Sequence, residues 1–410
     1  MDNQKIGNHE FDSQKISNQE IIDLESRYSA PNYRPMPIAI SRAEDVWVWD
    51  VEGKRYLDCI GAFASMCQGH RHPRIIEAMI EQLQRVTHVS RAFYNDRLGT
   101  FLKELCELTG YEMALPMNTG VEAVETAVKT ARKWAYRVKG VPQDKAEIIV
   151  CMGNFHGRTI TAVSMSTAEK QRTDSGPFTP GFKVIPFGDA AALAAAITLN
   201  TCAFLLEPVQ GDGGVIVPPD GYLAEVQEIC RQNNVLLIAD EIQSGLGRCG
   251  AFRACDLEDV KPDITTLGKA LGGGIYPLSA VLGSADLLNV YRPGEHGSTF
   301  GGNPLAAAVG IASLRVLKDE KLPQRSQEMG AYMKGRLQRI ESDLIKEVRG
   351  KGLLIGVELN VPARPFCESL INRGLLCKDT HTYTIRFAPP LTIKKQEMDW
   401  ALAQIEEVLQ

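Results

Sequence analysis

A lysine with three glycines close behind it is the first feature of the sequence that points to chemistry. Lys269 lies in the stretch DITTLGKALGGG, residues 263–274, directly after an apolar run. A lysine on a solvated helix needs no glycines behind it, whereas a lysine that meets a bulky ligand needs backbone without side chains in the way. The composition of this stretch therefore predicts that Lys269 faces a ligand.

A carboxylate ends the apolar run of the preceding predicted strand, just as Lys269 follows the run of its own strand. The stretch LLIADEIQ, residues 236–243, is an apolar run that ends on Asp240 and Glu241. A lysine and a carboxylate on neighbouring strand ends are what pyridoxal phosphate chemistry requires, because the amine holds the cofactor as a Schiff base and the carboxylate keeps the ring nitrogen protonated. Taken alone, Lys269 would suit an exposed helix start and Asp240 a helix cap. Their joint occurrence favours the cofactor.

A phosphate site is predicted at the start of a helix. Apolar residues at positions 121, 124, 128 and 131 have helical spacing and directly follow Asn118-Thr119-Gly120. Backbone N–H groups and the positive end of the helix dipole at Thr119, Gly120 and Val121 would bind an anion. A plain N-cap followed by glycine explains the same residues equally well.

Two other phosphate-binding motifs do not fit. GLGRCG, residues 245–250, matches the dinucleotide pattern, but the residues DEIQS separate it from the preceding strand and no helical face follows it. We therefore expect a tight loop there, and a nicotinamide-binding protein is the weaker alternative. A P-loop is excluded because Gly268-Lys269 is followed by alanine and lacks the upstream glycine.

The elements that must position these residues are strand-length runs rich in Val, Ile and Leu, alternating with helical patterns from about residue 111 onward. Such strands imply a mostly parallel sheet, whose ligands bind at the carboxyl ends of the strands, where Asn118, Glu207, Asp240 and Lys269 fall. VWVWDVEGKRYLDC, residues 46–59, predicts a hairpin. After about residue 306 the pattern changes to a second, α+β lobe.

The composition indicates small-molecule partners. The 410 residues are 44% hydrophobic and 23% charged, as in ordinary globular proteins. The net charge of -5 provides no basic surface for nucleic acid, and no segment reads as a signal peptide or membrane span. Ten scattered cysteines without a C-x-x-C pair indicate reduced thiols rather than a metal or redox site. We expect a cytoplasmic protein.

At these motifs the sequence resembles the class III, fold type I pyridoxal-phosphate aminotransferases, and within them it is most similar to the ornithine δ-aminotransferases. The similarity runs in order from about residue 25 to the C-terminus. The stretches that carry it are NYRPMPIAI, VWDVEGKRYLDC, QGHRHP, SRAFYN, PMNTGVEAVETAVKTARKW, GNFHGRT, LEPVQG, ADEIQSGLGRCG, LGKALGGGIYPLSAVL, GEHGSTFGGNPL, VRGKGLL and IRFAPPL.

The resemblance implies an α/β fold with a large cofactor-binding domain, in which helices flank a mostly parallel seven-stranded sheet, and a smaller α+β domain. We accordingly expect a flexible polar leader at residues 1–24 and an N-terminal segment of the small domain at 25–70. The large domain would span residues 71–310 and the C-terminal small domain residues 311–410.

The resemblance also assigns the contacts of the cofactor ring. Lys269 would form the Schiff base and then move the proton between the substrate carbon and the cofactor carbon. Asp240 would pair with the ring nitrogen, Gln243 would hydrogen-bond the phenolic oxygen, and Phe155 would stack on the ring.

The implied phosphate contacts come from two subunits. Gly120 and Val121 would bind the phosphate from their own subunit, and Ser298 and Thr299 would reach it from the neighbour. A site shared in this way makes a homodimer the smallest active unit.

For the substrates, the resemblance implies that Tyr33 and Arg158 bind the α-carboxylate of ornithine, which turns the δ-amine toward the cofactor. Arg158 would then bind the γ-carboxylate of 2-oxoglutarate and Arg386 its α-carboxylate, since arginine forks orient carboxylates. Two positions depart from the family pattern. Asp212 stands where a glutamate usually masks the arginine at 386, and Phe63 stands where a tyrosine helps to select ornithine.

The implied reaction transfers the δ-amino group of L-ornithine to 2-oxoglutarate, giving glutamate 5-semialdehyde and glutamate. Asp212 and Phe63 leave another ω-amine donor open: N-acetylornithine, lysine or 4-aminobutyrate. A third variation, His156 in place of a frequent tryptophan, is expected to be tolerated in packing and to alter the pocket rim. A fold type I amino-acid racemase also stays open, since one Schiff base supports several outcomes. A catalytically silent binding protein is disfavoured by the intact Lys269 and Asp240.

Overall fold

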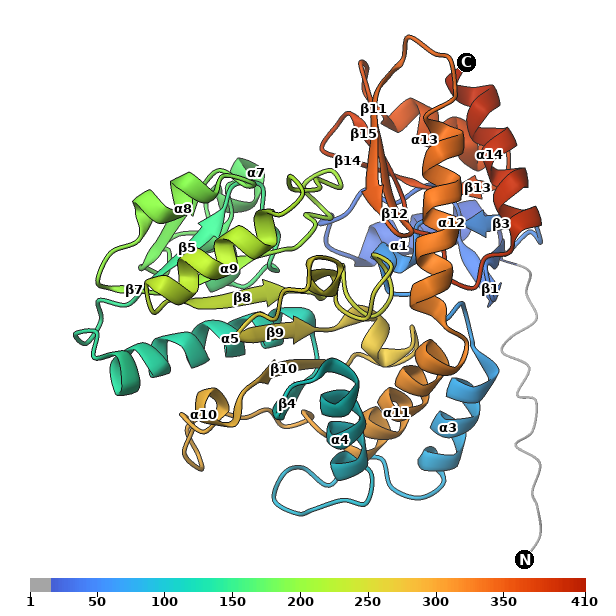
Figure 1. The fold of residues 1–410 in the computed structure, drawn as a ribbon. Helices are drawn as coiled ribbons and strands as arrows, with labels where there is room; N and C mark the ends of the chain where they lie inside the picture. Colours follow the sequence, from blue (N-terminus) through green and yellow to red (C-terminus); the bar gives the residue numbers. More distant parts are fainter. Residues whose placement is uncertain (1–15) are drawn as a thin grey trace, which may run out of the picture.

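A seven-stranded sheet forms the centre of the computed structural model, which describes residues 16–410 (Figure 1). β10 runs antiparallel to both of its neighbours, and the other neighbouring pairs are parallel. The expected mostly parallel sheet of seven strands is therefore confirmed, with one reversed strand. The strands are, in spatial order, β4 (Met113–Met117), β10 (Ser279–Gly283), β9 (Ile264–Leu267), β8 (Leu236–Asp240), β7 (Thr201–Leu206), β5 (Glu147–Cys151) and β6 (Phe182–Ile185).

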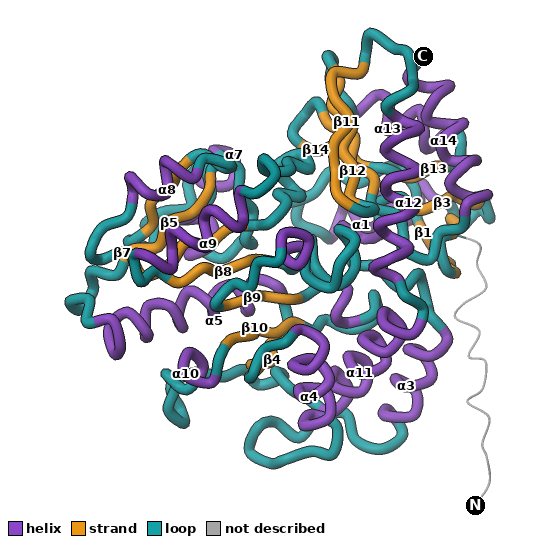
Figure 2. Tube along the Cα trace, viewed as in Figure 1, coloured by secondary structure: helices purple, strands orange, loops and turns teal. Residues whose placement is uncertain are grey.

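Successive residues of the central strands face opposite layers of helices, which explains their continuous apolar sequences. Ile148 of β5 packs in the cluster that contains α5 (Gly120–Trp134), whereas Ile149 packs in the opposite cluster with α8 (Ala190–Ala196) and α9 (Tyr222–Gln232). Both faces of the sheet are thus buried, as parallel strands with helical crossovers require. Figure 2 shows these strands with helices along both faces of the sheet.

The N-terminal strands share a sheet with the C-terminal part of the chain. β1 (Ile40–Glu44), β2 (Trp47–Asp50) and β3 (Arg55–Asp58) form an antiparallel meander, and β13 (Leu375–Leu376) pairs in parallel with β3. The predicted hairpin is confirmed, with Gly53 at a φ of +88° in the turn between β2 and β3.

A second antiparallel sheet completes the smaller lobe and carries three helices. Its strands lie in the order β11 (Ile345–Lys351), β12 (Leu354–Leu359), β15 (Thr384–Phe387) and β14 (Lys378–Thr380). The helices are α12 (Leu322–Leu337), α13 (Arg364–Asn372) and α14 (Lys395–Leu409). This is the α+β lobe that the change of pattern after residue 306 predicts.

The long helix α11 (Pro304–Asp319) belongs to the large lobe, where it packs on α3 (Pro73–Leu83) and α4 (Leu98–Thr109). Most of its residues are buried. The predicted boundary between residues 310 and 311 falls inside this helix, because one continuous apolar run keeps it against the large lobe.

Helix α1 (Asn18–Tyr28) begins inside the segment predicted to be a flexible leader. Ser17 Oγ accepts the N–H of Glu20, and a Glu20 carboxylate oxygen accepts the N–H of Ser17 at 2.8 Å. Asn18 Oδ1 accepts the N–H of Ala39 at 2.7 Å, which ties the helix to the lobe. The expectation is therefore corrected for residues 18–24, and residues 1–15 lie outside the described residues.

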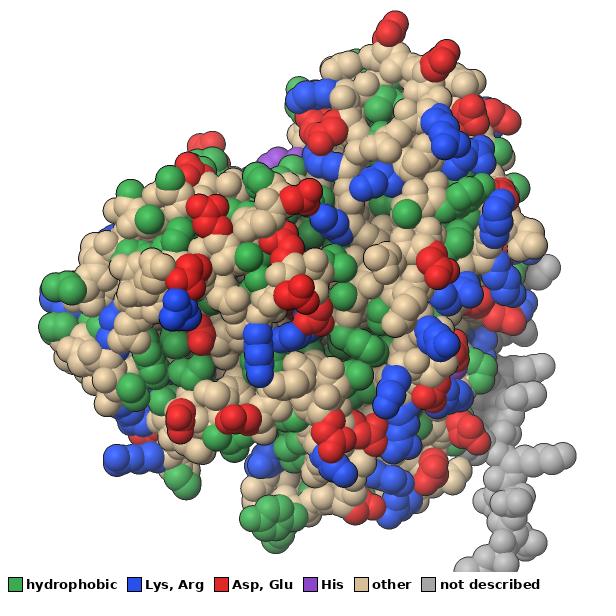
Figure 3. Space-filling model, viewed as in Figure 1, with side chains coloured by type: hydrophobic (Ala, Val, Ile, Leu, Met, Phe, Trp, Pro, Cys, Tyr) green, Lys and Arg blue, Asp and Glu red, His purple; other side chains and the backbone are tan. Residues whose placement is uncertain are grey.

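Short elements connect these layers. They are α2 (Gly61–Ala64), α6 (Ile160–Met165), α7 (Glu169–Arg172), α10 (Ala285–Leu288), the π-helical η1 (Ala135–Lys139) and the 3-10 turns η2 (Ala254–Glu258) and η3 (Lys269–Gly272). Between residues 16 and 410, none of the helices combines the length and the apolarity needed to cross a membrane. Acidic and basic side chains are interspersed on the face that Figure 3 shows.

Candidate active site

The two predicted reactive residues lie at adjacent strand ends. β8 and β9 pair in parallel so that Asp240, the last residue of β8, lies opposite Thr266, and Lys269 follows β9 after Gly268. Thr266 Oγ1 donates a hydrogen bond to Asp240 Oδ1 at 3.1 Å. The carboxyl edge of the sheet thus brings the amine and the carboxylate into one region, where parallel sheets bind their ligands.

The glycines that follow Lys269 pack against neighbouring side chains of the protein and not against a ligand space. Lys269 has a φ of +43° and opens η3. Gly273 and Gly274 have φ angles of +60° and +70°, and a Cβ there would lie 2.8 Å from Ile75 Cδ1 and 2.5 Å from Met66 Sδ. The prediction that these two glycines clear space for a ligand is therefore wrong, because they let the turn below the lysine pack closely.

The surroundings of Lys269 favour its neutral form. Burial lowers the pKa of Lys269 to about 8; the charge of Asp212 opposes this shift, and that of Arg386 adds to it. A larger share of the amine is neutral near pH 7 than for a lysine in water. Since a neutral amine is the nucleophile that attacks a carbonyl, the site favours Schiff-base formation at Lys269.

A buried histidine contacts Asp240. His156 Nδ1 lies 2.7 Å from Asp240 Oδ2, and the N–H of Ile242 donates to Asp240 Oδ1 at 3.2 Å. Burial by itself lowers the pKa of His156, but the hydrogen bond and the charge of Asp240 outweigh it and raise this pKa above its ordinary value. Because a carboxylate can accept about four hydrogen bonds, Asp240 can accept one more donor beside these and Thr266.

Glu207, directly after β7, is a second acid in this region and fixes the backbone of Phe155. Its Oε2 accepts the N–H of Phe155 at 3.0 Å. Burial raises the pKa of Glu207 to about 7, against the opposing charge of His156. The Phe155 ring extends toward Arg158, whose guanidinium carbon lies 5.5 Å from the ring centroid.

The N-terminus of α5 offers unpaired donors. Thr119 caps the helix, and a Glu122 carboxylate oxygen accepts the N–H of Thr119 at 2.7 Å in return. Among the described residues, the N–H groups of Gly120 and Val121 have no hydrogen-bond partner. A Cβ on Gly120 would lie 3.1 Å from Ile242, so glycine allows this close approach. These donors and the helix dipole suit a phosphate.

Gln243 lies under the loop that follows β7. A Cβ on Gly211 would lie only 1.8 Å from Gln243 Oε1, so the backbone of the loop passes directly over the amide. Arg386 Nη1 approaches the same oxygen at 3.5 Å. Gln243 therefore links the β8 end of the site to the residues of the neighbouring cavity.

A cavity of about 460 Å³ opens at this edge, and Phe63, Phe155, Arg158, Asp212 and Arg386 are among the residues that line it. Arg386 is only 4% exposed, and its Nη1 donates to Asp212 Oδ1 at 2.6 Å. Arg158 pairs with no carboxylate in the described part of the chain. The cavity thus contains one paired and one unpaired guanidinium.

The electrostatics of this pair favour its charged form. Burial tends to raise the pKa of Asp212, but the positive charges of Arg386 and Lys269 hold it below its ordinary value. The guanidinium carbon of Arg386 also lies 5.6 Å from the centroid of the Phe63 ring, within the range of a cation–π contact.

Comparison with known proteins agrees with this geometry. The family model described as aminotransferase class-III matches residues 28–409. The chain belongs to the class III aminotransferases. It is 58% identical over 389 residues to the ornithine aminotransferase of Brevibacillus brevis, a match that covers 95% of this chain and 98% of that protein.

Two solved aminotransferase structures are similar over nearly the whole chain. The ornithine aminotransferase of Toxoplasma gondii, crystallised with oxidised glutathione and with partial occupancy of PLP at its active site, has a TM-score of 0.95 and 45% identity, covering 96% of this chain and 94% of that one. The acetylornithine aminotransferase of Elizabethkingia anophelis has a TM-score of 0.88 and 44% identity, covering 96% and 98%.

One residue that contacts the site of this aminotransferase was missed from the sequence. Arg349 on β11 donates from Nη2 to Gly214 O at 2.8 Å and from Nε to Val215 O at 3.1 Å. It thereby holds the loop that carries Asp212. Arg349 lies in the motif VRGKGLL, but only the folded chain shows which loop it reaches.

Eight of the thirteen predicted site residues do not line the cavity of the aminotransferase: Tyr33, Gly120, Val121, Asp240, Gln243, Lys269, Ser298 and Thr299. Tyr33 is 67% exposed and does not line it. Ser298 Oγ accepts a hydrogen bond from Asn118 Nδ2 at 2.7 Å, next to the start of α5, and Thr299 is exposed. The assigned roles of these residues, like those of the other site residues, stay predictions.

Proposed function

We propose that this class III aminotransferase transfers the δ-amino group of L-ornithine to 2-oxoglutarate, giving glutamate 5-semialdehyde and glutamate. The observation that carries the proposal is the pair of arginines in one cavity: Arg386 is bound to Asp212, and Arg158 has no carboxylate partner within residues 16–410. Ornithine has one carboxylate and 2-oxoglutarate has two. One available arginine suits the donor, and a second that can be released suits the acceptor.

The residues at the sheet edge fit pyridoxal 5'-phosphate. Gly120 and Val121 present free N–H groups for the phosphate, Asp240 has acceptor capacity for a ring N–H, and Lys269 has a lowered pKa. Phe155 would lie against the ring. The bound cofactor supplies a carbonyl carbon for the amine and a ring that withdraws electrons from the reacting carbon.

The protein's own groups would orient and deprotonate the donor. Arg158, with Tyr33, would bind the α-carboxylate of ornithine and so direct the δ-amine toward Lys269. The Lys269 amine would then move a proton from the δ-carbon of ornithine to the cofactor carbon, as a positioned general base and acid. Thr266 and His156 would hold the Asp240 carboxylate in place beside the ring nitrogen.

The second substrate would use both arginines. Asp212 would release Arg386, which would then bind the α-carboxylate of 2-oxoglutarate while Arg158 binds the γ-carboxylate. Because the carboxylates at both ends of 2-oxoglutarate would then be bound, its oxo carbon would be placed at the reacting position. Gln243, beside Arg386, would bind the phenolic oxygen of the cofactor.

A homodimer is part of the same proposal. Thr299 is exposed and Ser298 lies beside Asn118 at the start of α5, so this loop can border the phosphate of an adjoining subunit. A cytoplasmic location is also proposed, supported by the ten free cysteines, all of them in the described residues.

N-acetylornithine is the second candidate donor. Phe63 lacks the hydroxyl that the family uses to select ornithine, Asp212 is shorter than glutamate, and one similar structure is an acetylornithine aminotransferase. A panel of amine donors with 2-oxoglutarate separates the two, comparing the native enzyme with Phe63→Tyr and Asp212→Glu. We expect ornithine to give the highest kcat/KM. A native preference for acetylornithine, lysine or 4-aminobutyrate would overturn the assignment of ornithine.

A further inference from the structure

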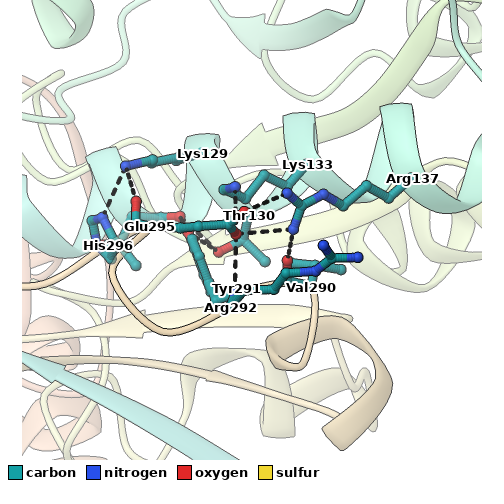
Figure 4. Close-up of polar contacts among 10 residues, drawn as sticks. Lys129, Thr130, Lys133, Arg137, Val290, Tyr291, Arg292, Glu295 and His296 are labelled. Atoms are coloured by element: carbon teal, nitrogen blue, oxygen red, sulfur yellow. Dashed lines mark hydrogen bonds and ion pairs between the residues drawn. The ribbon is translucent and has the colours of Figure 1, made fainter.

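The loop of residues 290–299, between α10 and α11, is fastened along one side of α5 and η1 (Figure 4). Glu295 is the centre of the fastening. Its Oε1 accepts from Arg137 Nη2 at 2.6 Å, and its Oε2 accepts from Lys133 Nζ at 2.8 Å and from the N–H of Arg292 at 3.0 Å. One carboxylate thus joins two helical cations to the turn of the loop.

Further contacts follow the same helix face. Lys129 Nζ donates to Glu295 O at 3.0 Å, and Tyr291 OH lies 2.9 Å from Thr130 Oγ1. His296 Nε2 lies 2.9 Å from Thr126 Oγ1. Positions 126, 129, 130, 133 and 137 recur at helical spacing, so the loop lies along a single side of the helix.

The far end of this loop contacts the turn that precedes α5 in its own subunit. Ser298 Oγ accepts from Asn118 Nδ2 at 2.7 Å and from the N–H of Gly301 at 3.1 Å. Asn118 immediately precedes the turn in which Gly120 and Val121 have free N–H groups. The helix that presents these donors at its N-terminus therefore also holds the loop, and fixes both groups relative to each other.

Charge makes Glu295 the critical contact. Lys129, Lys133 and Arg137 form a row of positive charges on one helix side, and among the described residues Glu295 is the one carboxylate that pairs with two of them. Hydrogen bonds from Arg137 and Lys133 hold the pKa of Glu295 far below its usual range. The carboxylate therefore stays charged at any pH at which the protein works.

We propose that Glu295 is a positioning residue for the cofactor phosphate. It holds the loop that carries Ser298 and Thr299 against α5, so that these two residues lie close to the N-terminus of that helix. The inference rests on the proposed function, which supplies the cofactor, and on the dimer, in which this loop borders the neighbour's phosphate. Without the carboxylate Lys133 and Arg137 would lose their counter-charge, and the loop would move away from the phosphate.

The test compares two cofactor forms that differ only in the phosphate. Dissociation constants for pyridoxal 5'-phosphate and for pyridoxal are measured from the absorbance of the lysine adduct, in the native protein and in Glu295→Gln. We expect Glu295→Gln to weaken pyridoxal phosphate binding by about tenfold, the loss of one charge-assisted contact. Pyridoxal binding should stay unchanged.

Glu104→Gln is the matched control, because Glu104 forms a similar two-point pair with Arg315 at 2.6 and 3.1 Å on the outside of α4 and α11. It should change neither constant. Arg137→Gln removes the guanidinium partner of Glu295 and should show the same loss of binding for pyridoxal phosphate but not for pyridoxal. It replaces Glu295→Gln if that variant does not fold.

Two results would overturn the inference. One is unchanged binding of pyridoxal phosphate in both Glu295→Gln and Arg137→Gln; the other is an equal loss of affinity for pyridoxal and for pyridoxal phosphate. A native protein that binds neither form would instead remove the proposed function, so the two failures are distinguishable. Sedimentation of each variant checks that the oligomeric state is retained.

Discussion

Arg386 on β15 and Asp212 in the loop after β7 form an ion pair at 2.6 Å that joins the small lobe to the large one. Arg386 is buried, whereas the side chain of Asp212 is 34% exposed toward the cavity. Water and substrate can therefore reach the carboxylate more easily than the guanidinium. Asp212 is the partner that can leave, and the arginine is the fixed part of the pair.

Removing the charge of Asp212 should favour the dicarboxylic acceptor. In Asp212→Asn, Arg386 no longer has a carboxylate that competes with the substrate. We therefore expect the KM for 2-oxoglutarate to fall by about three- to tenfold, which corresponds to about 1 kcal/mol of ion-pair free energy that the substrate no longer has to overcome. Stopped-flow absorbance of each half-reaction measures this. Asp220→Asn is the control, because Asp220 pairs with Lys351 at the surface. Equal constants in native and Asp212→Asn enzyme would contradict the masking role.

Loosening the Asp212 loop at its other attachment should have a related, smaller effect. Arg349→Lys keeps the charge but loses the fork that donates to Gly214 and Val215, so we expect about 1–3 kcal/mol lower unfolding free energy and a lower KM for 2-oxoglutarate. Denaturant unfolding and steady-state kinetics test the two effects.

Lys346→Gln is the control for Arg349→Lys, since Lys346 binds the same acid, Glu358, without touching the loop. If the arginine acts through Asp212, the kinetic effects of Arg349→Lys and Asp212→Asn should not add in the double variant. Full additivity would show that Arg349 stabilises the fold only.

Attachment of the cofactor should depend on the pH through Lys269. Only the neutral amine attacks a carbonyl, and the pKa of Lys269 is lowered to about 8. The rate at which the cofactor-free protein captures pyridoxal phosphate should therefore rise about tenfold per pH unit below 8 and level off above it. Asp212 raises this pKa, so Asp212→Asn should move the inflection to lower pH. An inflection near 10 would contradict the burial effect.

The contact between His156 and Asp240 should appear in the pH dependence of stability. The pKa of His156 is raised on folding, so its contribution is fully present below about pH 6.5, the ordinary value, and is lost as the pH rises through the raised value. The difference in Tm between the cofactor-free native protein and His156→Leu should therefore become smaller as the pH rises. His156→Gln, which keeps a donor for Asp240, should retain part of the advantage at high pH. A constant difference across the range would contradict this.

Local patterns were sufficient to predict the strands and the reactive pair. Each central strand is a short apolar run. Asp240 ends one of them and Lys269 follows another after Gly268, so their shared sheet edge could be inferred without the structure. The reversed direction of β10 could not, because β10 is as apolar as its parallel neighbours and its direction depends on the connections at its two ends.

Contacts between distant segments could not be predicted in the same way. His156 is 84 positions from Asp240, and Arg349 is 135 positions from Gly214, so no local spacing relates them. The capping box of Ser17 and Glu20 did carry a local signal for α1, which the polar character of the leader concealed. Composition alone does not explain Gly211: a side chain there would collide with Gln243, and only the folded chain brings these two residues together.

Lys269 is the residue that we propose binds the cofactor covalently, and every other role proposed for the site depends on this bond. Reduction of the coloured protein with borohydride, followed by peptide mass mapping, tests it directly. We expect a pyridoxal phosphate label on the peptide that contains Lys269, and no label in Lys269→Ala. A label on another lysine, or a native protein that takes up none, would contradict it.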